Sequence, residues 1–276
     1  MAAIRVLTLG AGQDIGRSCV VVTLGGRRVM FDCGMHMGYH DHRRFPDWRQ
    51  LGARAGEPLT GAIDCVVITH FHLDHCGALP YLTEKLGYDG PLYMTQPTAA
   101  IAAILLKDYL HVLNSGGKHG GDGGGGALYS AADVDACLRK VTCIALGETV
   151  QVDDELRLCT YYAGHVIGAV MVSAESLGQR VVYTGDFNTV ADRHLGAARI
   201  TRLEPHVLIT ESTYATSIRE SKRCREAEML RLVHAAVAEG GKVLIPSFAV
   251  GRAQVLIFQS EMTSRVASHW RPIVLS

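Results

Sequence analysis

The sequence predicts an α/β fold. Short apolar runs that are typical of buried strands are separated by turns rich in glycine. Other segments carry apolar residues at the three- and four-residue spacing of amphipathic helices. Strand-like and helix-like segments alternate after residue 207, which is typical of a parallel α/β unit. Hydrophobic residues make up 48% of the 276-residue chain, enough to pack one large domain or two modest ones.

Composition limits the classes of function. The 27 basic and 27 acidic side chains balance, so bulk charge does not indicate a nucleic-acid partner, and a polyanion would need a local basic patch. Eight scattered cysteines include no Cys-x-x-Cys pair, which favours a reduced, intracellular compartment over a disulfide framework. The first residues lack the apolar core of a signal peptide, and no apolar run approaches the ~18 residues of a membrane-spanning helix. We therefore expect a soluble intracellular protein.

The chain begins with three expected strands, over residues 4–9, 19–24 and 28–31. Between the first two lies the run Gly10-Ala11-Gly12-Gln13-Asp14-Ile15-Gly16. It matches a dinucleotide-binding fingerprint poorly, because its third glycine comes one position late and the next segment is a strand rather than a helix. We interpret these glycines as allowing a tight backbone turn near a site.

The third strand ends at Asp32, for which two interpretations stand side by side. An acidic residue at a strand end can orient a metal-bound histidine, but it more often caps a turn, and the residue alone favours the turn. Residues 35–62 are expected to be irregular. The histidines at positions 36, 40 and 42 and the Arg43-Arg44 pair are interpreted as solvated surface groups.

The remaining elements follow from apolar spacing and turn residues. Expected helices cover residues 79–86, residues 97–113, a short stretch capped by Ser130, a stretch that begins near Ser221, and residues 252–267. Expected strands cover residues 65–68, 92–94, 141–145, 150–152, 156–161, 169–174, 181–183, 207–210, 242–246 and 272–275. The glycine-rich run at 116–126 cannot pack a core and is expected to form a flexible loop.

The segment directly after residues 65–68 has the highest density of potential metal ligands. Thr69-His70-Phe71-His72-Leu73-Asp74-His75 places three imidazoles and one carboxylate within six positions. These groups are typical ligands of zinc in open, catalytic sites. Residues two apart in extended backbone point the same way, so His70 and His72 are expected to face one metal ion, and a turn after Leu73 directs Asp74 and His75 toward a second. Surface or core histidines are the alternative, but four such groups are costly to hold together without a metal.

Two later loop residues supply further ligands. His165 and Asp186 each follow a strand, and the glycine beside each allows close backbone approach. We expect His70, His72 and His165 to hold one zinc ion. Asp74 and His75 are expected to hold a second zinc ion, and Asp186 to bridge both. Such a pair stabilises the attacking and leaving oxygens of a hydrolysis together and provides hydroxide at neutral pH, which Asp74 is expected to orient.

These motifs resemble those of a known superfamily. His-x-His-x-Asp-His after a strand, a later Gly-His and a Thr-Gly-Asp sequence are similar to the metallo-β-lactamase superfamily. Asp32 matches its early aspartate, which changes the interpretation of that residue. The resemblance implies an αββα sandwich with a dinuclear site at one edge. A narrower resemblance to the β-CASP RNA nucleases rests on residues 10–18, Glu211-Ser212-Thr213-Tyr214, residues 242–246 and Gly251-Arg252-Ala253-Gln254.

The narrower resemblance implies a zinc-dependent RNA endonuclease that acts in the nucleus. It implies a role in RNA 3′-end processing, with partner subunits of an Integrator-like or a cleavage and polyadenylation complex. Catalytic roles are then expected for Asp32, Asp74 and Glu211, of which Glu211 matches an acidic residue that pairs in the family with a later histidine acting as general acid. We expect a metallo-β-lactamase domain over residues 1–215 and the N-terminal part of a β-CASP domain over residues 216–276.

The resemblance also implies a truncated chain. Two further family histidines, one of which completes the second zinc site, have no match before Ser276. We therefore expect one zinc ion to bind tightly, the second to bind weakly, and RNA cleavage to be poor.

Two other functions stay open from the sequence. A small-molecule hydrolase of the same fold would use the same zinc motif, although the Glu-Ser-Thr-Tyr and Gly-Arg-Ala-Gln stretches favour the nuclease. The other open function is that of a non-catalytic interaction fragment, although all six metal ligands expected within this chain are intact. The RNA that is cut cannot be read from the chain, because fold and metal chemistry do not read bases.

Overall fold

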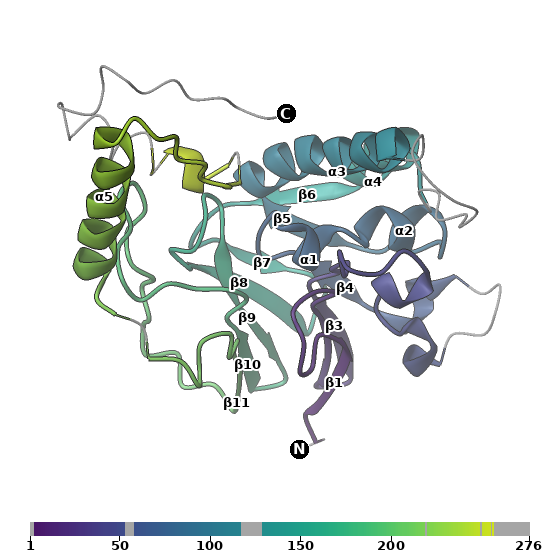
Figure 1. Ribbon diagram of the computed structural model, residues 1–276. Coiled ribbons are helices and arrows are strands. Elements are labelled where there is room, and N and C mark those ends of the chain that lie inside the picture. Colours follow the sequence, from purple (N-terminus) through teal and green to yellow (C-terminus); the bar gives the residue numbers. More distant parts are fainter. Residues whose placement is uncertain are drawn as a thin grey trace. The chain divides into compact units, whose positions relative to one another are not determined.

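The computed structural model describes residues 3–52, 58–116, 129–218, 220–248, 250–254 and 256. The chain divides into two compact units, Met1–Glu211 and Ser212–Ser276. The first unit carries two β-sheets and helices α1 to α4, and the second carries helix α5 (Lys222–Ala238) (Figure 1). No helix in the described ranges is both long and apolar enough to cross a membrane.

The first sheet has the strand order β1-β2-β3-β4-β5-β6. Its strands are β1 (Arg5–Gly10), β2 (Cys19–Leu24), β3 (Arg27–Phe31), β4 (Cys65–Val67), β5 (Leu92–Thr95) and β6 (Val141–Ile144). The first three strands pair antiparallel, whereas β3 to β6 pair parallel. Because the parallel strands β3 and β4 end at one edge of the sheet, Asp32 and the histidine-rich segment emerge side by side.

The second sheet has the order β11-β10-β9-β8-β7. Its strands are β7 (Thr149–Gln151), β8 (Leu156–Tyr162), β9 (Val170–Ser176), β10 (Gln179–Tyr183) and β11 (Val207–Ile209). Strands β8 and β10 both run antiparallel to β9, which lies between them. They therefore share a direction, and the loops after them, which carry His165 and Asp186, leave the same edge of this sheet.

The hydrophobic core lies between the two sheets. Alternate residues of the central strands β2, β3, β4, β8, β9 and β10 are buried in it, such as Val22 and Val67 from the first sheet and Leu158 and Val172 from the second. The rings of Phe31 and Tyr183 stack across the interface with centroids 5.1 Å apart. The predicted α/β class and the two-sheet sandwich are confirmed.

Four helices of the first unit accompany the first sheet. They are α1 (Leu73–Cys76), α2 (Leu79–Glu84), α3 (Gln96–Gly116) and α4 (Ala131–Arg139). Helix α3 packs against β5 and β6, and α4 packs against α2 and α3 (Figure 1). Ser130 caps α4 as expected and forms a full capping box with Asp133.

Three predictions about local structure need correction. Residues 242–246 form no strand and are mostly exposed, because a strand requires a hydrogen-bonding neighbour and none of the described residues pairs with them. The stretch 35–62 contains three 3-10 helices, His42–Arg44, Trp48–Leu51 and Leu59–Ala62. Arg44 is not a solvated group, since it is only 1% exposed and its Nη1 donates to Tyr109 Oη at 3.4 Å.

Other predicted features fall partly or wholly outside the described residues. Residues 252–254 and 256 of the expected last helix are helical, and the remainder of that helix is not described. The expected strand at 272–275 also lies outside the described residues, as does the glycine-rich run apart from Gly116, which ends α3. All eight cysteines are free thiols.

Candidate metal centre

The loop between β4 and α1 positions the first two ligands on one side of the backbone. Phe71, only 1% exposed, anchors the loop in the interior. His70 and His72 flank it and approach each other, with His70 Nε2 and His72 Nδ1 3.0 Å apart. His72 then precedes α1, and Asp74 and His75 lie in its first turn. The local backbone thus divides the segment into two pairs of side chains.

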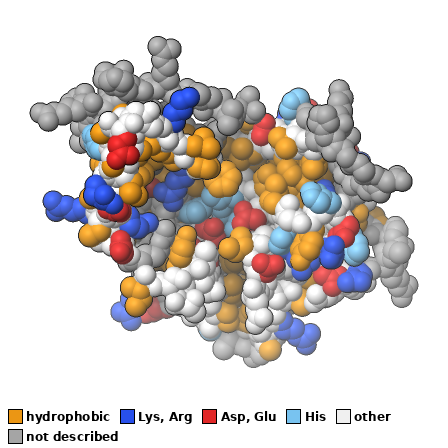
Figure 2. All heavy atoms as spheres, viewed as in Figure 1, with side chains coloured by type: hydrophobic (Ala, Val, Ile, Leu, Met, Phe, Trp, Pro, Cys, Tyr) orange, Lys and Arg blue, Asp and Glu red, His pale blue; other side chains and the backbone are white. Residues whose placement is uncertain are grey.

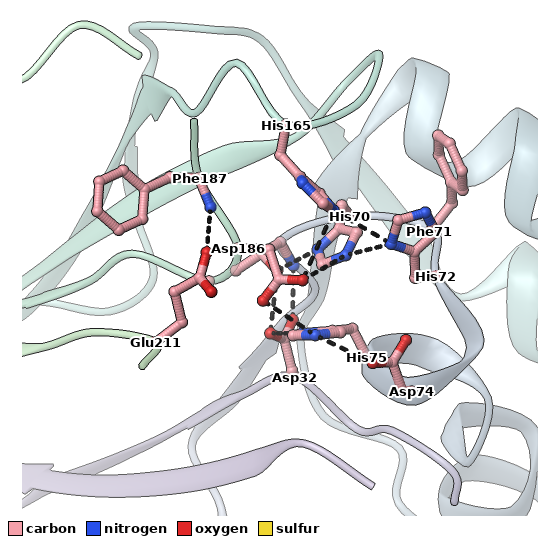
Figure 3. Close-up of polar contacts among 12 residues, drawn as sticks. Asp32, His70, Phe71, His72, Asp74, His75, His165, Asp186, Phe187 and Glu211 are labelled. Atoms are coloured by element: carbon pink, nitrogen blue, oxygen red, sulfur yellow. Dashed lines mark hydrogen bonds and ion pairs between the residues drawn. The ribbon is translucent and has the colours of Figure 1, made fainter. Parts of the chain in front are cut away.

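His165 and Asp186 from the second sheet meet this segment (Figure 3). His165 Nε2 lies 3.2 Å from His72 Nδ1. Asp186 Oδ2 lies 3.6 Å from His165 Nε2 and 4.0 Å from His70 Nε2. One ligand atom from each of the four residues lies within 4.8 Å of the others, and we call this set the first donor group.

The first donor group fits a metal ion better than it fits protons. Three ring nitrogens converge at 3.0 and 3.2 Å, and one proton can bridge only two of them. A tetrahedral ion with ligands at about 2.0–2.1 Å has ligand atoms about 3.3 Å apart, close to these separations. The donor set of neutral imidazoles and one carboxylate is also the chemistry that suits an open zinc site.

A second donor group consists of Asp74, His75 and Asp186. His75 Nε2 lies 3.4 Å from Asp186 Oδ1 and 3.7 Å from Asp74 Oδ2. Asp186 therefore turns one oxygen toward each group, with Oδ2 facing the first and Oδ1 facing the second.

Asp32 supports both groups from behind and takes no part in either. Its buried carboxylate accepts hydrogen bonds from Thr69 N at 2.7 Å, Thr69 Oγ1 at 2.9 Å and Tyr183 Oη at 3.0 Å. It also lies 2.7 Å from His75 Nδ1. Asp32, which was expected to orient a metal-bound histidine, therefore contacts His75.

The Asp32 network sets the ring nitrogens that face the centre. When His75 Nδ1 donates to Asp32, its Nε2 is left with a lone pair directed toward Asp186. Thr69 Oγ1 donates to Asp32 and lies 3.0 Å from His70 Nδ1, so it accepts from that nitrogen and leaves His70 Nε2 to the first group. The contacts at Nδ1 thus leave Nε2 as the nitrogen of both histidines that can bind a metal once its ring is neutral.

Burial and neighbouring charges set the protonation of the ligands before a metal ion binds. Burial lowers the pKa of His70, and three neighbouring imidazoles lower it further. Burial also acts to lower the pKa of His75, but Asp32 outweighs it and raises this pKa to about 9. Burial raises the pKa of Asp186 to about 6, against the opposing effect of His75. Because ligands must be deprotonated, metal binding at the second group displaces a proton from His75.

Glu211 lies beside the centre and belongs to neither donor group. Its Oε1 accepts a hydrogen bond from Phe187 N at 3.0 Å, and its charge contributes to the raised pKa of Asp186 (Figure 3). The bond ties the end of the first unit to the loop that carries Asp186. Figure 2 shows histidine and acidic side chains gathered near the middle of the displayed face.

A glycine permits the approach of the two sheets at this edge. Gly185 has φ +52°, and a Cβ at this position would lie 2.7 Å from Thr69 Oγ1. A larger residue would push the Asp186 loop away from the histidine segment. Position 185 therefore requires glycine for steric reasons. The sequence alone shows only that a glycine precedes Asp186.

The structure brings all six predicted ligands, Asp32 and Glu211 to one edge of the sandwich. Two supporting residues, Thr69 and Tyr183, were missed by sequence reasoning. Both directly flank recognised motifs, as the residue before His70 and the third residue before Asp186. A polar group next to a ligand was the signal that could have identified Thr69, whereas Tyr183 is visible only once β10 is placed over β3.

The comparisons with known proteins identify the superfamily of this chain. The family described as "Metallo-beta-lactamase superfamily domain" matches residues 21–214. The chain belongs to the metallo-β-lactamase superfamily. Its superfamily fold and its cluster of histidines and aspartates together provide a site that can hold a metal ion.

Close relatives of this superfamily member carry names of RNA-processing subunits. The chain is 54% identical over 256 residues to "Integrator complex subunit 11" of Danio rerio, covering 93% of this chain and 42% of that protein. It is 54% identical over 254 residues to "Cleavage and polyadenylation specificity factor subunit 3-II" of Arabidopsis thaliana, covering 92% and 40%. The chain spans about two fifths of the length of these curated relatives. Among solved structures, "Zn(2+)-bound PqqB from Methylobacterium extorquens" aligns with TM-score 0.42 and 19% identity, over 71% of this chain and 60% of that chain.

Proposed function

We propose that this chain is the metal-binding part of a zinc-dependent RNA endonuclease that acts in nuclear RNA 3′-end processing. The observation that carries the proposal is the position of Asp186 between two donor groups, with one oxygen directed to each. Two-metal sites of this kind are suited to hydrolysis of phosphodiesters. The names of the relatives, with identities of 54%, support RNA 3′-end processing over hydrolysis of a small molecule.

The proposal includes two zinc ions of unequal affinity. The first donor group offers four ligand atoms and the second offers three, one of which competes with a proton on His75. Tighter binding is therefore proposed at the first group. A bound ion would supply Lewis-acid chemistry, lowering the pKa of water and polarising a phosphoryl oxygen.

The side chains have separate tasks in this proposal. Asp74 accepts a hydrogen bond from the attacking water and orients it toward the phosphorus. Asp32 holds the rings of His75 and, through Thr69, His70 in the orientation that leaves Nε2 available. Glu211 fixes the Asp186 loop through Phe187 N. The proposed setting is a nuclear complex of the Integrator type or the cleavage and polyadenylation type, with other subunits as partners.

Cleavage of a short unstructured RNA tests the proposal. With zinc present, we expect slow cleavage that is lost on chelation and reduced at least about 100-fold by Asp74→Asn, because the water loses its proton acceptor. His40→Gln is the matched control, since His40 is exposed and lies outside both donor groups. The readout is the rate of product formation on a denaturing gel.

A chromogenic β-lactam and a thioester, offered in parallel, address the small-molecule alternative. Hydrolysis of either substrate without cleavage of RNA would contradict the proposal. Equal RNA cleavage by Asp74→Asn and the unsubstituted chain would also contradict it.

A further inference from the structure

A second concave site lies in the first unit, apart from the donor groups. Its cavity of about 580 Å³ is bounded by the Gly10–Gly12 turn after β1, by Arg17, by residues 42–43 and 45–50 and by Tyr81 of α2. This volume lies within the range of ligand sites in proteins. None of the metal-binding side chains lines it, so the metal centre does not account for it.

The charge of the lining favours an anion. The lining contains three arginines, at positions 17, 43 and 49, and a single carboxylate, that of Asp47. Asp47 is already engaged by Arg49 Nε at 2.7 Å and by Gln50 Nε2 at 3.3 Å. Arg43 is engaged by Asp41, which does not line the cavity. Arg17 is therefore the arginine of the lining whose charge is not balanced by one of these carboxylates.

Arg17 is fixed in place without being neutralised. Its Nη1 donates to the backbone carbonyl oxygens of Arg43 and Phe45 at 3.0 and 3.5 Å. Within the described ranges no carboxylate lies at ion-pair distance from its guanidinium. A guanidinium held by neutral acceptors keeps its full charge for a phosphate, which it can bind through two parallel hydrogen bonds.

Aromatic rings form the apolar part of the lining. Phe45 and Tyr81 stack with centroids 4.3 Å apart and planes 18° from parallel. Trp48 adds an indole to the same cavity. Flat aromatic faces beside a basic group are the combination that binds single-stranded nucleic acid, because a base stacks while its phosphate is neutralised.

The cavity is connected by the backbone to the metal centre. Arg17 directly precedes Ser18, whose backbone amide donates to the carbonyl oxygen of Asp74 at 2.8 Å. A residue of the cavity wall is therefore one position away from a direct bond to the metal-binding segment.

We propose that the cavity binds one unpaired nucleotide of the RNA strand, outside the bond that is cut. The base lies against Tyr81 and Trp48, since Phe45 is only 4% exposed and supports Tyr81 from behind, and the phosphate pairs with Arg17. This inference rests on the proposed function, since it assigns a further subsite to the same substrate. In this proposal the turn at residues 10–12, which contains Gly10 and Gly12, leaves room for the nucleotide.

Tryptophan fluorescence tests the subsite without any cleavage. The chain has two tryptophans, so Trp270→Phe leaves Trp48 as the single reporter. The probes are a 2′-O-methyl oligouridylate that cannot be cut through its 2′-oxygen, uridine monophosphate, and inorganic phosphate, each with a chelator present. We expect saturable quenching by the oligonucleotide, weaker quenching by the mononucleotide and none by phosphate.

Matched variants assign the quenching to the cavity. Arg17→Gln is expected to raise the Kd for the oligonucleotide at least tenfold, whereas Arg202→Gln, at an exposed arginine outside the cavity, changes it less than twofold. Gly12→Leu is a second variant that removes no contact, because no heavy atom lies within 4 Å of a Cβ at Gly12. It is expected to weaken binding by filling the cavity.

Three results would overturn the inference. They are the absence of saturable quenching by the oligonucleotide, equal quenching by inorganic phosphate, or binding of the mononucleotide alone. Unchanged affinity in both Arg17→Gln and Gly12→Leu would also overturn it. Because binding is measured without metal, a chain that binds the oligonucleotide and cuts no RNA would disprove the proposed function and leave the subsite in place.

Discussion

Asp32 shows how much of this centre depends on one buried carboxylate. It has φ +60°, a left-handed conformation that aspartate and asparagine adopt more readily than other side chains with a Cβ. Its oxygens contact Thr69, His75 and Tyr183, which come from both sheets. A turn-capping aspartate would need only local backbone partners, so the contacts decide between the two interpretations open from the sequence.

Asp32→Asn is expected to lower the free energy of unfolding by about 3 kcal/mol. Asparagine keeps the backbone conformation but loses the charge that faces His75, and breaking a buried ion pair typically costs about 3–5 kcal/mol. Urea denaturation of the metal-free chain measures the change. Asp154→Asn, at an exposed carboxylate, is the control and should stay within about 0.5 kcal/mol of the unsubstituted chain. A similar loss in both variants would refute a special role for Asp32.

Elements with strong local signals were predicted well. The strand at residues 19–24 has the predicted bounds, and α4 begins after Ser130 as its capping residue indicates. The segment at 242–246 also contains a run of apolar residues, Val243-Leu244-Ile245, and forms no strand. The difference is physical: a helix completes its hydrogen bonds within itself, whereas a strand completes them only with a neighbour. Local pattern therefore predicts helices and central strands better than strands that depend on a distant partner.

Ser130→Ala is expected to destabilise the first unit by about 1 kcal/mol through loss of the α4 cap. Ser130 Oγ accepts from Asp133 N at 3.2 Å, and Asp133 Oδ2 accepts from Ser130 N at 2.7 Å. Ser130→Thr keeps the hydroxyl and is the control. Urea denaturation monitored by circular dichroism measures both variants, and equal stability of Ala and Thr variants would argue against the cap.

The same capping box gives a pH dependence. Hydrogen bonds from Lys85 and Ser130 lower the pKa of Asp133 to about 2. A carboxyl whose pKa is lowered on folding adds stability above its unfolded pKa of about 3.9, and this stability is lost as the pH falls toward 2.

At the scale of the whole sandwich, the metal centre joins the two sheets. His70 and His72 follow β4 of the first sheet, and Asp186 follows β10 of the second. A bound ion would therefore crosslink layers that also meet through the apolar core and through the hydrogen bond from Tyr183 Oη to Asp32. Because such an ion binds the folded sandwich and has no comparable site in the unfolded chain, its binding adds to stability by mass action.

Zinc is expected to raise the melting temperature of the chelated protein by roughly 8–16 °C. At a free zinc concentration 1,000 times the Kd, binding adds about 4 kcal/mol, and each kcal/mol corresponds to about 2–4 °C for a chain of this size. Differential scanning calorimetry measures the shift. His165→Ala should remove most of this temperature shift, because His165 is a ligand that belongs only to the first donor group. The control His40→Ala should show the full shift. A full shift in His165→Ala would show that zinc acts elsewhere.

The sequence by itself determined the ligand types, the His-x-His-x-Asp-His spacing and the α/β class, because these depend on neighbours along the chain. Tertiary structure decided that Asp186 divides its oxygens between two donor groups, that Tyr183 reaches Asp32 and that Arg44 is buried. These contacts join residues far apart in the chain, and their geometry depends on strand direction, sheet order and the packing of one sheet on the other. A pattern with a period of two or 3.6 residues carries no information about which distant loop meets which, so the centre exists only once the two sheets have packed.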